Sequence, residues 1–403
     1  MSERSGGFSK TRLGRMADVM RGYVDRGEIA GAVTLLCRHD EVHVEAIGAR
    51  DLATAAPMRR DTIFRIASMT KPITAAAAMI LVEEAKLRLD EPVDRWLPEL
   101  ANRKVLRGID SPLDDTVPAR RPVTLRDLLT FRLGLGAVMV FPERYPIQKA
   151  MVEAGLAPGP RPLPFSPDEF MTRVGRLPLM HQPGEQWMYH TGSDILGVLI
   201  ARASGMSLGD FLKERILGPL GMEDTAFSVP EAKLDRLATC YQGDAATSRL
   251  AVFDEARGGL WARPPVFESG GGGLVSTADD YLAFGQMLLR YGRHGTDRIL
   301  SRPAVELMTT DQLTAEQKAA SPFGQGFWET RGWGFGLSVI TRRDGVGLSP
   351  GSFGWDGGFS TSGYCDPREE MVGVLLVQRM MTSPTGFDFH RDFWTLACQA
   401  IDD

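Results

Sequence analysis

Residues 65–72 read Arg65-Ile66-Ala67-Ser68-Met69-Thr70-Lys71-Pro72, and an apolar run follows as far as residue 82. The pattern predicts a helix that begins close to Ser68. Side chains three positions apart share one helix face, about 5–6 Å apart at Cβ, so Lys71 should reach the hydroxyl of Ser68. A lysine there helps to deprotonate the hydroxyl, and the free N–H groups of a first helical turn favour developing negative charge. We therefore interpret the stretch as a nucleophilic serine, with the N–H of Ser68 as one half of an oxyanion hole.

The Ser-x-x-Lys spacing is by itself weak evidence. With 21 serines and 8 lysines in 403 residues, about 0.4 such pairs are expected by chance, and a motif match is only a hypothesis. An ordinary capped amphipathic helix explains this stretch equally well. The rest of the chain has to decide between the two.

The composition, with 43% hydrophobic and 24% charged residues, is that of an ordinary globular protein. Its length allows two structural regions, or one large domain with an insertion. A net charge of −5 and a pI near 5.8 argue against nucleic acid or an anionic membrane as a partner. No apolar stretch reaches the ~18 residues of a membrane-spanning helix.

The residues that could bind metals or form disulfides are scattered. The four cysteines form no C-x-x-C pair and are expected to be reduced core residues: Cys37, Cys240, Cys365 and Cys398. The six histidines form no H-E-x-x-H motif, so we expect neither a metal site nor a cofactor. No apolar segment follows residues 1–7, which predicts a cytoplasmic protein.

The spacing of apolar residues differs between the ends and the middle of the chain. Strand patterns occur at 32–38, 41–48, 334–341, 354–364 and 371–377, and residues 8–26 and 386–401 read as amphipathic helices. Helical patterns fill most of the middle. We therefore predict an α/β (α+β) fold, in which residues 1–65 and 275–403 form an antiparallel sheet flanked by helices. Residues 66–274 form an inserted, mostly helical region.

Two segments of the middle are not helical in pattern. Residues 158–167 contain five prolines, and Phe141 and Tyr145 lie earlier in the same segment, 137–167, which predicts an extended, ordered loop of a kind that is often functional. Residues 270–273 are four glycines, and the Lys-Ser/Thr of a phosphate-binding loop does not follow them. We expect a backbone turn there, before a helix capped by Ser276 or Thr277.

Several further strings occur in one order along the chain. They are Leu87-Arg88-Leu89-Asp90, Val123-Thr124-Leu125-Arg126-Asp127-Leu128-Leu129, Gln182-Pro183-Gly184-Glu185-Gln186-Trp187-Met188-Tyr189, Gly218-Pro219-Leu220-Gly221-Met222 and Gly271-Gly272-Gly273-Leu274-Val275-Ser276-Thr277. With the Ser68 stretch they resemble the serine β-lactamase superfamily, in its class C-like branch, over about residues 31–379. Within it, the chain resembles most closely the β-lactamase-like carboxylesterases of the family VIII type and related acyltransferases. The resemblance implies a β-lactamase/D-Ala-D-Ala peptidase-like fold.

The resemblance implies a second catalytic element at Tyr189-His190-Thr191, where the family has Tyr-x-Asn. A free tyrosine has a pKa of about 10 and is a poor base at neutral pH. The ammonium of Lys71 would stabilise the phenolate, so that Tyr189 and Lys71 together take the serine proton. Thr191 stands where the family often has asparagine and offers no amide. We expect His190 and Thr191 to face the substrate.

The third element of the family, Lys-Thr-Gly, falls at Trp355-Asp356-Gly357, which resembles the Trp-x-Gly or His-x-Gly of esterase-like members. The resemblance makes the N–H of Gly358 the second oxyanion donor and places these residues against the substrate. The lysine of the family helps to hold a substrate carboxylate. Trp355 offers an apolar face, which suits a neutral acyl or alcohol group. The alternative is that Trp355 simply packs the sheet.

A rival serine lies in Gly347-Leu348-Ser349-Pro350-Gly351, which matches the G-x-S-x-G of α/β-hydrolases. That motif needs a preceding strand, a helix directly after it, and then an acid and a histidine. Here a strand pattern follows, and only Asp366 or Asp388 with His390 could complete a triad. We expect a turn between strands.

These patterns predict a serine carboxylesterase that hydrolyses short-chain acyl esters, or transfers the acyl group, through an acyl-enzyme on Ser68. Its substrate is expected to be a small-molecule ester bound near Tyr145 and Phe141, with no nucleic-acid or membrane partner. A homo-oligomer is compatible with the sequence. One alternative is an amide hydrolase of the same fold (a β-lactamase, a D-aminopeptidase or a linear amide hydrolase). The other is a non-catalytic binding protein on this scaffold.

Overall fold

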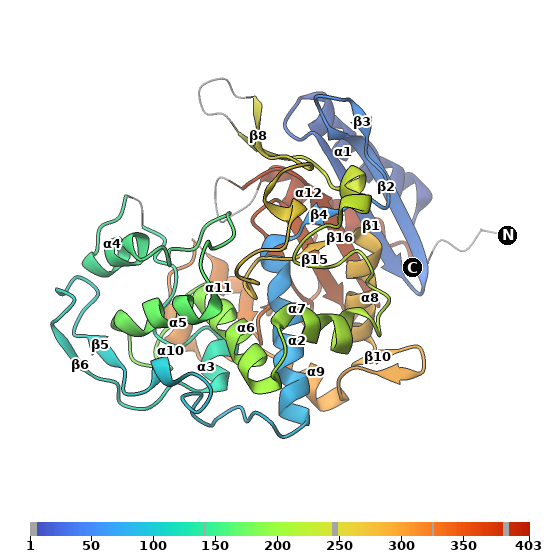
Figure 1. Cartoon of the computed structure of the whole chain (residues 1–403). Coiled ribbons are helices and arrows are strands. Elements are labelled where there is room, and N and C mark those ends of the chain that lie inside the picture. The colour runs from blue at the N-terminus through green and yellow to red at the C-terminus, as the bar shows by residue number, and fades with distance from the viewer. Residues whose placement is uncertain (1–5, 141, 244–248, 325, 382–386) are drawn as a thin grey trace.

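The computed structural model describes residues 6–140, 142–243, 249–324, 326–381 and 387–403. It contains an eight-stranded sheet in the order β12-β13-β14-β15-β16-β1-β2-β3, with each neighbouring pair antiparallel (Figure 1). These strands are β1 (Gly31–Arg38), β2 (Glu41–Asp51), β3 (Ala56–Pro57), β12 (Arg331–Trp333), β13 (Ser338–Ile340), β14 (Phe353–Gly357), β15 (Thr361–Asp366) and β16 (Met371–Val377). Strands from both ends of the chain thus share one antiparallel sheet, which confirms the predicted fold class.

The remaining elements are helices and short strand pairs. The α-helices are α1 (Lys10–Asp25), α2 (Thr70–Glu83), α3 (Leu125–Leu129), α4 (Pro146–Glu153), α5 (Pro167–Arg176), α6 (Thr191–Ser204), α7 (Leu208–Leu212), α8 (Ala278–Leu289), α9 (Arg302–Met308), α10 (Ala315–Ala319), α11 (Phe327–Thr330) and α12 (Asp388–Gln399). The strand pairs are β4 (Phe64–Arg65) with β9 (Val275–Ser276), β5 (Lys104–Leu106) with β6 (Thr116–Pro118), β7 (Cys240–Gly243) with β8 (Leu250–Asp254), and β10 (Arg293–His294) with β11 (Asp297–Arg298).

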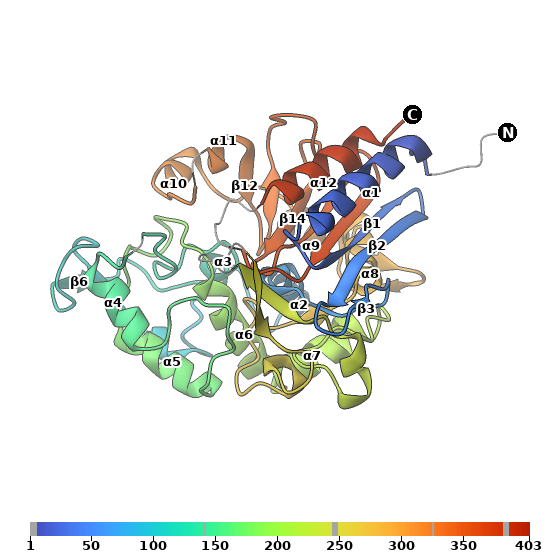
Figure 2. The same cartoon turned by 90° about the horizontal axis from the view of Figure 1, so that it is seen from above.

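Helices cover both faces of the sheet. α1 and α12 lie side by side on one face (Figure 2), and α8 packs on β15 and β16 from the other. Successive side chains of a strand point to opposite faces, so Leu36 of β1 joins the cluster under α1 and α12 while Leu35 joins the larger core. Every residue of β1 and β16 is buried as a result.

α2 carries the Ser-x-x-Lys stretch into the larger core. Residues 70–81 are all buried, and the small side chains of the alanines at 75–78 let neighbouring segments approach this helix closely. α6 packs beside it. In the described part of the chain no single helix is long and apolar enough to cross a membrane. Among these residues, only α6 taken together with residues Leu208–Leu217 has the length and apolar composition of a membrane span, and this pair is bent by 79°.

Two local expectations were wrong. Residues 354–364 are not one strand but the hairpin of β14 and β15, which turns at Ser360 with a φ of 64°. The segment 137–167 is not simply extended, because α4 lies inside it with Pro146 at its first turn, where proline is well tolerated. The turn expected at the glycines is confirmed, with the N–H of Gly273 donating to Ser269 O at 3.0 Å. The capped helix is confirmed too, since Thr277 caps α8 by accepting from the N–H of Asp280.

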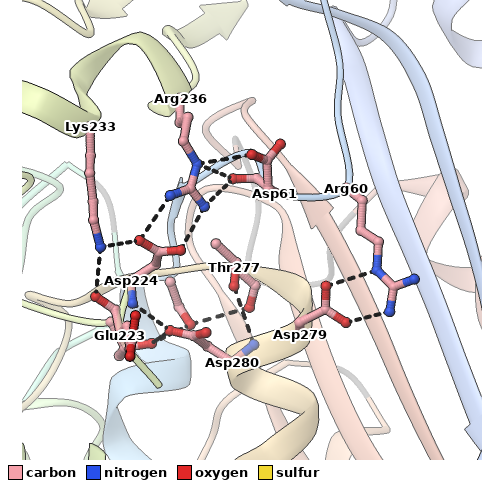
Figure 3. Close-up of polar contacts among 11 residues, drawn as sticks. Arg60, Asp61, Glu223, Asp224, Lys233, Arg236, Thr277, Asp279 and Asp280 are labelled. Atoms are coloured by element: carbon pink, nitrogen blue, oxygen red, sulfur yellow. Dashed lines mark hydrogen bonds and ion pairs between the residues drawn. The ribbon is translucent and has the colours of Figure 1, made fainter. Parts of the chain in front are cut away.

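A polar network braces the segment just before Ser68 (Figure 3). β4 pairs with β9, and Ala226 bridges to Val275 of β9 from a neighbouring segment. Asp224 anchors that segment by accepting hydrogen bonds from Arg236 and Lys233. Asp280 accepts from the hydroxyl of Thr225 at 2.8 Å and from the N–H of Asp224 at 2.9 Å. Charge-assisted hydrogen bonds of this kind are stronger than neutral ones. They fix the strand pair from which the chain enters the Ser68 turn.

Candidate active site

Ser68 lies in a single 3₁₀ turn between β4 and α2. The turn begins at Ala67, which has a φ of 45°. This left-handed backbone is unfavourable for alanine, and such strain is typically of order 1–3 kcal/mol per residue. Neighbouring contacts hold it: the N–H of Ile66 donates to Leu274 O at 3.0 Å, and the Thr361 hydroxyl donates to Ile66 O at 3.1 Å.

Lys71 lies one turn further on and points back to Ser68. Its Nζ is 2.8 Å from Ser68 Oγ and 3.2 Å from Nδ1 of His190, and it also donates to the carbonyl oxygen of Gly271. Lys71 has no exposed surface. Burial lowers the pKa of Lys71 to about 7, although the nearby Asp194 carboxylate raises it. A large share of this lysine is therefore neutral at neutral pH and can accept a proton.

Tyr189 presents its hydroxyl to Ser68 from the other side. The indole N–H of Trp355 donates to Tyr189 Oη at 2.7 Å, and the phenol shares a hydrogen bond with Ser68. Burial raises the pKa of Tyr189 well above its usual range, against the opposing effect of these two hydrogen bonds. Nζ of Lys71 lies 4.7 Å from the centre of the tyrosine ring. The arrangement favours a protonated phenol beside a neutral amine, rather than a phenolate beside an ammonium.

His190 sits in a strained turn immediately before α6. Its φ of 81° and ψ of −66°, with a hydrogen bond from Thr191 N–H to Tyr189 O at 3.2 Å, define a rare form of γ-turn. The side chain does not simply face the substrate, as the sequence suggested: Nε2 lies 3.1 Å from Oδ2 of Asp194. Burial and the nearby Lys71 lower the pKa of His190, so the imidazole is neutral. Thr191 Oγ1 is buried with no hydrogen-bond partner among the described residues.

Asp194 and the glycine run had no role in the site predicted from the sequence. Oδ1 of Asp194 accepts from the Ser269 hydroxyl at 2.6 Å and from the N–H of Gly271 at 2.9 Å. A Cβ at Gly271 would lie 2.9 Å from that same oxygen, so only glycine fits there. The i,i+4 spacing of His190 and Asp194 at a helix start was the one available signal.

The Trp355-Asp356-Gly357 segment forms the end of β14 beside Ser68. The centres of the Trp355 and Trp333 rings are 4.7 Å apart, and the Trp355 residue is 4% exposed. Trp355 therefore packs the sheet as well as lining a cavity. Asp356 accepts from the hydroxyl of Ser362 at 2.6 Å. A Cβ on Gly357 would lie 2.3 Å from Ile66 O, which shows how closely this strand approaches the nucleophile turn.

Two cavities meet at this cluster. The first has a volume of about 610 Å³, and its lining includes Ser68, Tyr189, Trp355, Asp356 and Gly358. The second, of about 370 Å³, is more apolar, and its lining includes Phe170, Trp261, Phe267, His190 and Thr191. Residues shared by both linings, namely Pro158, Gly159, Pro160, His190 and Gly272, form the border between the cavities.

One of the two aromatic residues expected from the 137–167 segment does not reach this site. Tyr145 lies at the start of α4, packed against the core, and is not among the described residues that line either cavity. That expectation failed because α4 turns this part of the segment into a helix. Phe141 lies outside the described residues. Met139 and residues 158–160 are the parts of the segment that reach the first cavity.

Ser349 lies in a different environment. Its side chain is fully buried, its Oγ accepts from Arg343 at 2.7 Å, and its N–H donates to Asp366 at 2.8 Å. The strand β14 follows it, where a nucleophile elbow requires a helix. Elsewhere, the described residues contain no group of three or more His, Cys, Asp and Glu side chains that could hold a metal ion. The four cysteines are free, and three of them are buried.

Comparison with known proteins places the chain in the Beta-lactamase family, to which it belongs over residues 16–393. It is 32% identical over 392 residues to the lovastatin esterase of Penicillium rubens, covering 91% of this chain and 93% of that one. It is 31% identical over 378 residues to esterase EstB of Burkholderia gladioli, covering 87% and 86%. The solved structure of EstCE1, a hydrolase with promiscuous acyltransferase activity, matches with a TM-score of 0.79 at 25% identity, over 98% and 99% of the two chains.

These relatives are esterases and acyltransferases built on the β-lactamase fold. The family and fold predicted from the sequence are confirmed. The protein is an enzyme of the serine hydrolase class, in agreement with the predicted ester hydrolysis or acyl transfer.

Proposed function

We propose that this enzyme hydrolyses short-chain acyl esters of small-molecule alcohols, or transfers their acyl group, through an acyl-enzyme on Ser68. The observation that carries the proposal is the 2.8 Å contact between Ser68 Oγ and Nζ of a buried lysine whose pKa is lowered to about 7. Ser68 lines a cavity large enough for a small ester, and Lys71 is buried beside it. The cytoplasmic location and the homo-oligomer stay predictions of the sequence.

In the proposed reaction, neutral Lys71 takes the hydroxyl proton while Ser68 Oγ attacks the ester carbonyl carbon. The N–H groups of Ser68 and Gly358 hold the oxyanion; one such donor typically contributes about 2.7–4 kcal/mol. The C–O bond of the ester then breaks, and the proton from Lys71 reaches the leaving alcohol through the Tyr189 hydroxyl. Water or an acceptor alcohol then gives its proton to Lys71 and attacks the acyl-enzyme. The acyl–Oγ bond breaks, and Lys71 returns the proton to Ser68 Oγ.

The cavity supports a neutral ester rather than an amide substrate that carries a carboxylate. Where peptidases and β-lactamases of the superfamily have a lysine, Trp355 uses its indole N–H on Tyr189 and turns an apolar ring to the cavity. Asp356 and Asp344 also line this cavity, together with Arg331, so its charge does not favour an anion. Thr191 offers no amide for substrate recognition. We assign the apolar second cavity, with Phe170 and Phe267, to the acyl or alcohol group.

The test is hydrolysis of p-nitrophenyl butyrate by the wild type and by Ser68→Ala at equal folded concentration, with nitrocefin as the competing substrate. We expect the wild type to hydrolyse the ester faster than it hydrolyses nitrocefin. We expect Ser68→Ala to hydrolyse the ester at least about 10³-fold more slowly than the wild type. Ester hydrolysis that survives in Ser68→Ala would contradict the proposal. Faster turnover of nitrocefin would favour the amide hydrolase instead.

A further inference from the structure

His190 contacts Lys71, and Asp194 contacts His190. Asp194 Oδ2 lies 3.1 Å from His190 Nε2, and His190 Nδ1 lies 3.2 Å from Lys71 Nζ. The chain of contacts thus runs from a buried carboxylate through an imidazole to the lysine amine. Asp194 is 5% exposed and His190 is half-buried, so solvent competes little with these contacts.

The surroundings of Asp194 decide which nitrogen of His190 carries the proton. Burial raises the pKa of Asp194, but the pair with His190 and the hydrogen bonds from Ser269 and Gly271 outweigh it and keep the pKa low. The ionised carboxylate is only an acceptor. A neutral His190 must therefore carry its proton on Nε2, facing Asp194, and its Nδ1 presents a lone pair to Lys71.

The orientation of the lysine amine follows from that tautomer. A neutral amine has two N–H groups and one lone pair. Gly271 O and His190 Nδ1 are both pure acceptors, so the two N–H groups of Lys71 point at them. The lone pair is then left for the third neighbour, Ser68 Oγ at 2.8 Å, whose proton it has to accept.

The backbone is shaped to make these contacts. The γ-turn at His190 is strained, and strain of this kind persists where the surrounding structure fixes it. The single Gly271 residue ties both ends of the chain of contacts: its N–H donates to Asp194 while its carbonyl accepts from Lys71. A Cβ there would also lie 3.1 Å from the His190 ring.

We propose that His190 and Asp194 are positioning residues that fix the imidazole tautomer and thereby aim the lone pair of Lys71 at Ser68. The inference rests on the proposed acyl-enzyme chemistry of Ser68. The charged and titratable groups that face His190 are Lys71 on α2, Asp194 on α6 and the Tyr189 ring, whose centre lies 6.0 Å from that of the imidazole. Together these groups account for its protonation.

Asp194→Asn is the decisive variant because it keeps shape and hydrogen bonding but reverses the tautomer. Two donors, from Ser269 and Gly271, require an oxygen at the Oδ1 position. The introduced NH₂ group therefore faces Nε2 of His190 and moves the imidazole proton to Nδ1, which turns the lone pair of Lys71 away from Ser68. A wrong tautomer behind a catalytic base lowers kcat by up to about 10⁴-fold in serine proteases. We expect about 100-fold here, because the imidazole acts through the lysine.

The measurement is the second-order rate of labelling by a fluorophosphonate, together with kcat and KM for p-nitrophenyl butyrate across pH. We expect Asp194→Asn to lower the labelling rate and kcat by about 100-fold with KM nearly unchanged. Since Asp194 raises the pKa of Lys71, the acid limb of kcat/KM should also move to lower pH. Asp366→Asn is the matched control: its buried carboxylate accepts backbone N–H bonds from Ser349 and Arg368, and it should leave both readouts unchanged.

A second pair of variants keeps the test valid if Asp194→Asn folds poorly. His190→Ala should lower the labelling rate about 100-fold, and His190→Asn should recover about tenfold of this, because its amide oxygen can accept from Lys71 and asparagine tolerates positive φ. Equal labelling of wild type and Asp194→Asn, or no recovery in His190→Asn, would overturn the inference while the Ser68 mechanism stands. Fluorophosphonate labelling that is as fast in Ser68→Ala as in the wild type would overturn both this inference and the Ser68 mechanism.

Discussion

Replacing Lys71 with methionine should abolish ester hydrolysis, and its effect on folding stability should be more favourable at pH 7 than at pH 10. The buried lysine has its pKa lowered from 10.5 to about 7, chiefly by burial. At a pH between these values the unfolded chain binds one more proton than the folded protein, so stability rises with pH. By linkage, this term destabilises the wild type by about 4 kcal/mol at pH 7 and by only about 1 kcal/mol at pH 10.

Methionine carries no charge, so Lys71→Met lacks the pH-dependent destabilisation that the buried lysine causes. It also leaves the acceptors Gly271 O and His190 Nδ1 without a donor, at about 1–3 kcal/mol each, but that loss does not depend on the lysine proton. The stability difference between variant and wild type should therefore be about 3 kcal/mol more favourable at pH 7 than at pH 10. Urea unfolding followed by tryptophan fluorescence measures it. Lys149→Met, at an exposed position, controls for the loss of a lysine. A difference that is the same at both pH values would refute the reasoning.

Two further substitutions test contacts around the nucleophile. Trp355→Phe removes the N–H that donates to Tyr189 Oη and should lower kcat/KM for p-nitrophenyl butyrate about tenfold, the equivalent of one hydrogen bond. Tyr23→Phe, which removes a hydrogen bond to Asp392 at a position outside both cavity linings, should not; equal losses would count against a role for Trp355. Arg65→Met breaks the buried ion pair with Asp254 and should reduce the free energy of unfolding by about 3–5 kcal/mol. Arg60→Met, at an exposed pair, should change it by less than about 1 kcal/mol in the same urea titration, and comparable values would contradict the difference in burial.

The parts of the fold that were predicted correctly depend on local patterns. The first hairpin, the helices α1 and α12, and the approach of Lys71 to Ser68 follow from apolar periodicity and from residue spacing within one element. The assembly of one sheet from both ends followed because strand patterns occurred only there. α4 was missed because prolines in its segment masked a short helix that begins at Pro146.

The parts of the candidate site that were missed depend on contacts between distant segments. The peptide of Gly271 joins Lys71 to Asp194, although it lies far along the chain from either residue. Trp355 reaches Tyr189 from the distant strand β14, and no local pattern indicates that its N–H rather than its ring face points there. His190 was expected to face the substrate because its neighbour Asp194 received no role. Only the folded arrangement shows that His190 contacts Lys71 and that Asp194 contacts His190.

The central claim is that catalysis passes through an acyl group on Ser68. The most direct measurement is intact-protein mass spectrometry after rapid acid quench of the enzyme with excess p-nitrophenyl butyrate, followed by peptide mapping. The account predicts a mass increase of one butyryl group on the peptide that contains Ser68, absent in Ser68→Ala. Turnover of the ester with no acylated species, or with the butyryl group on another residue such as Ser349, would contradict it.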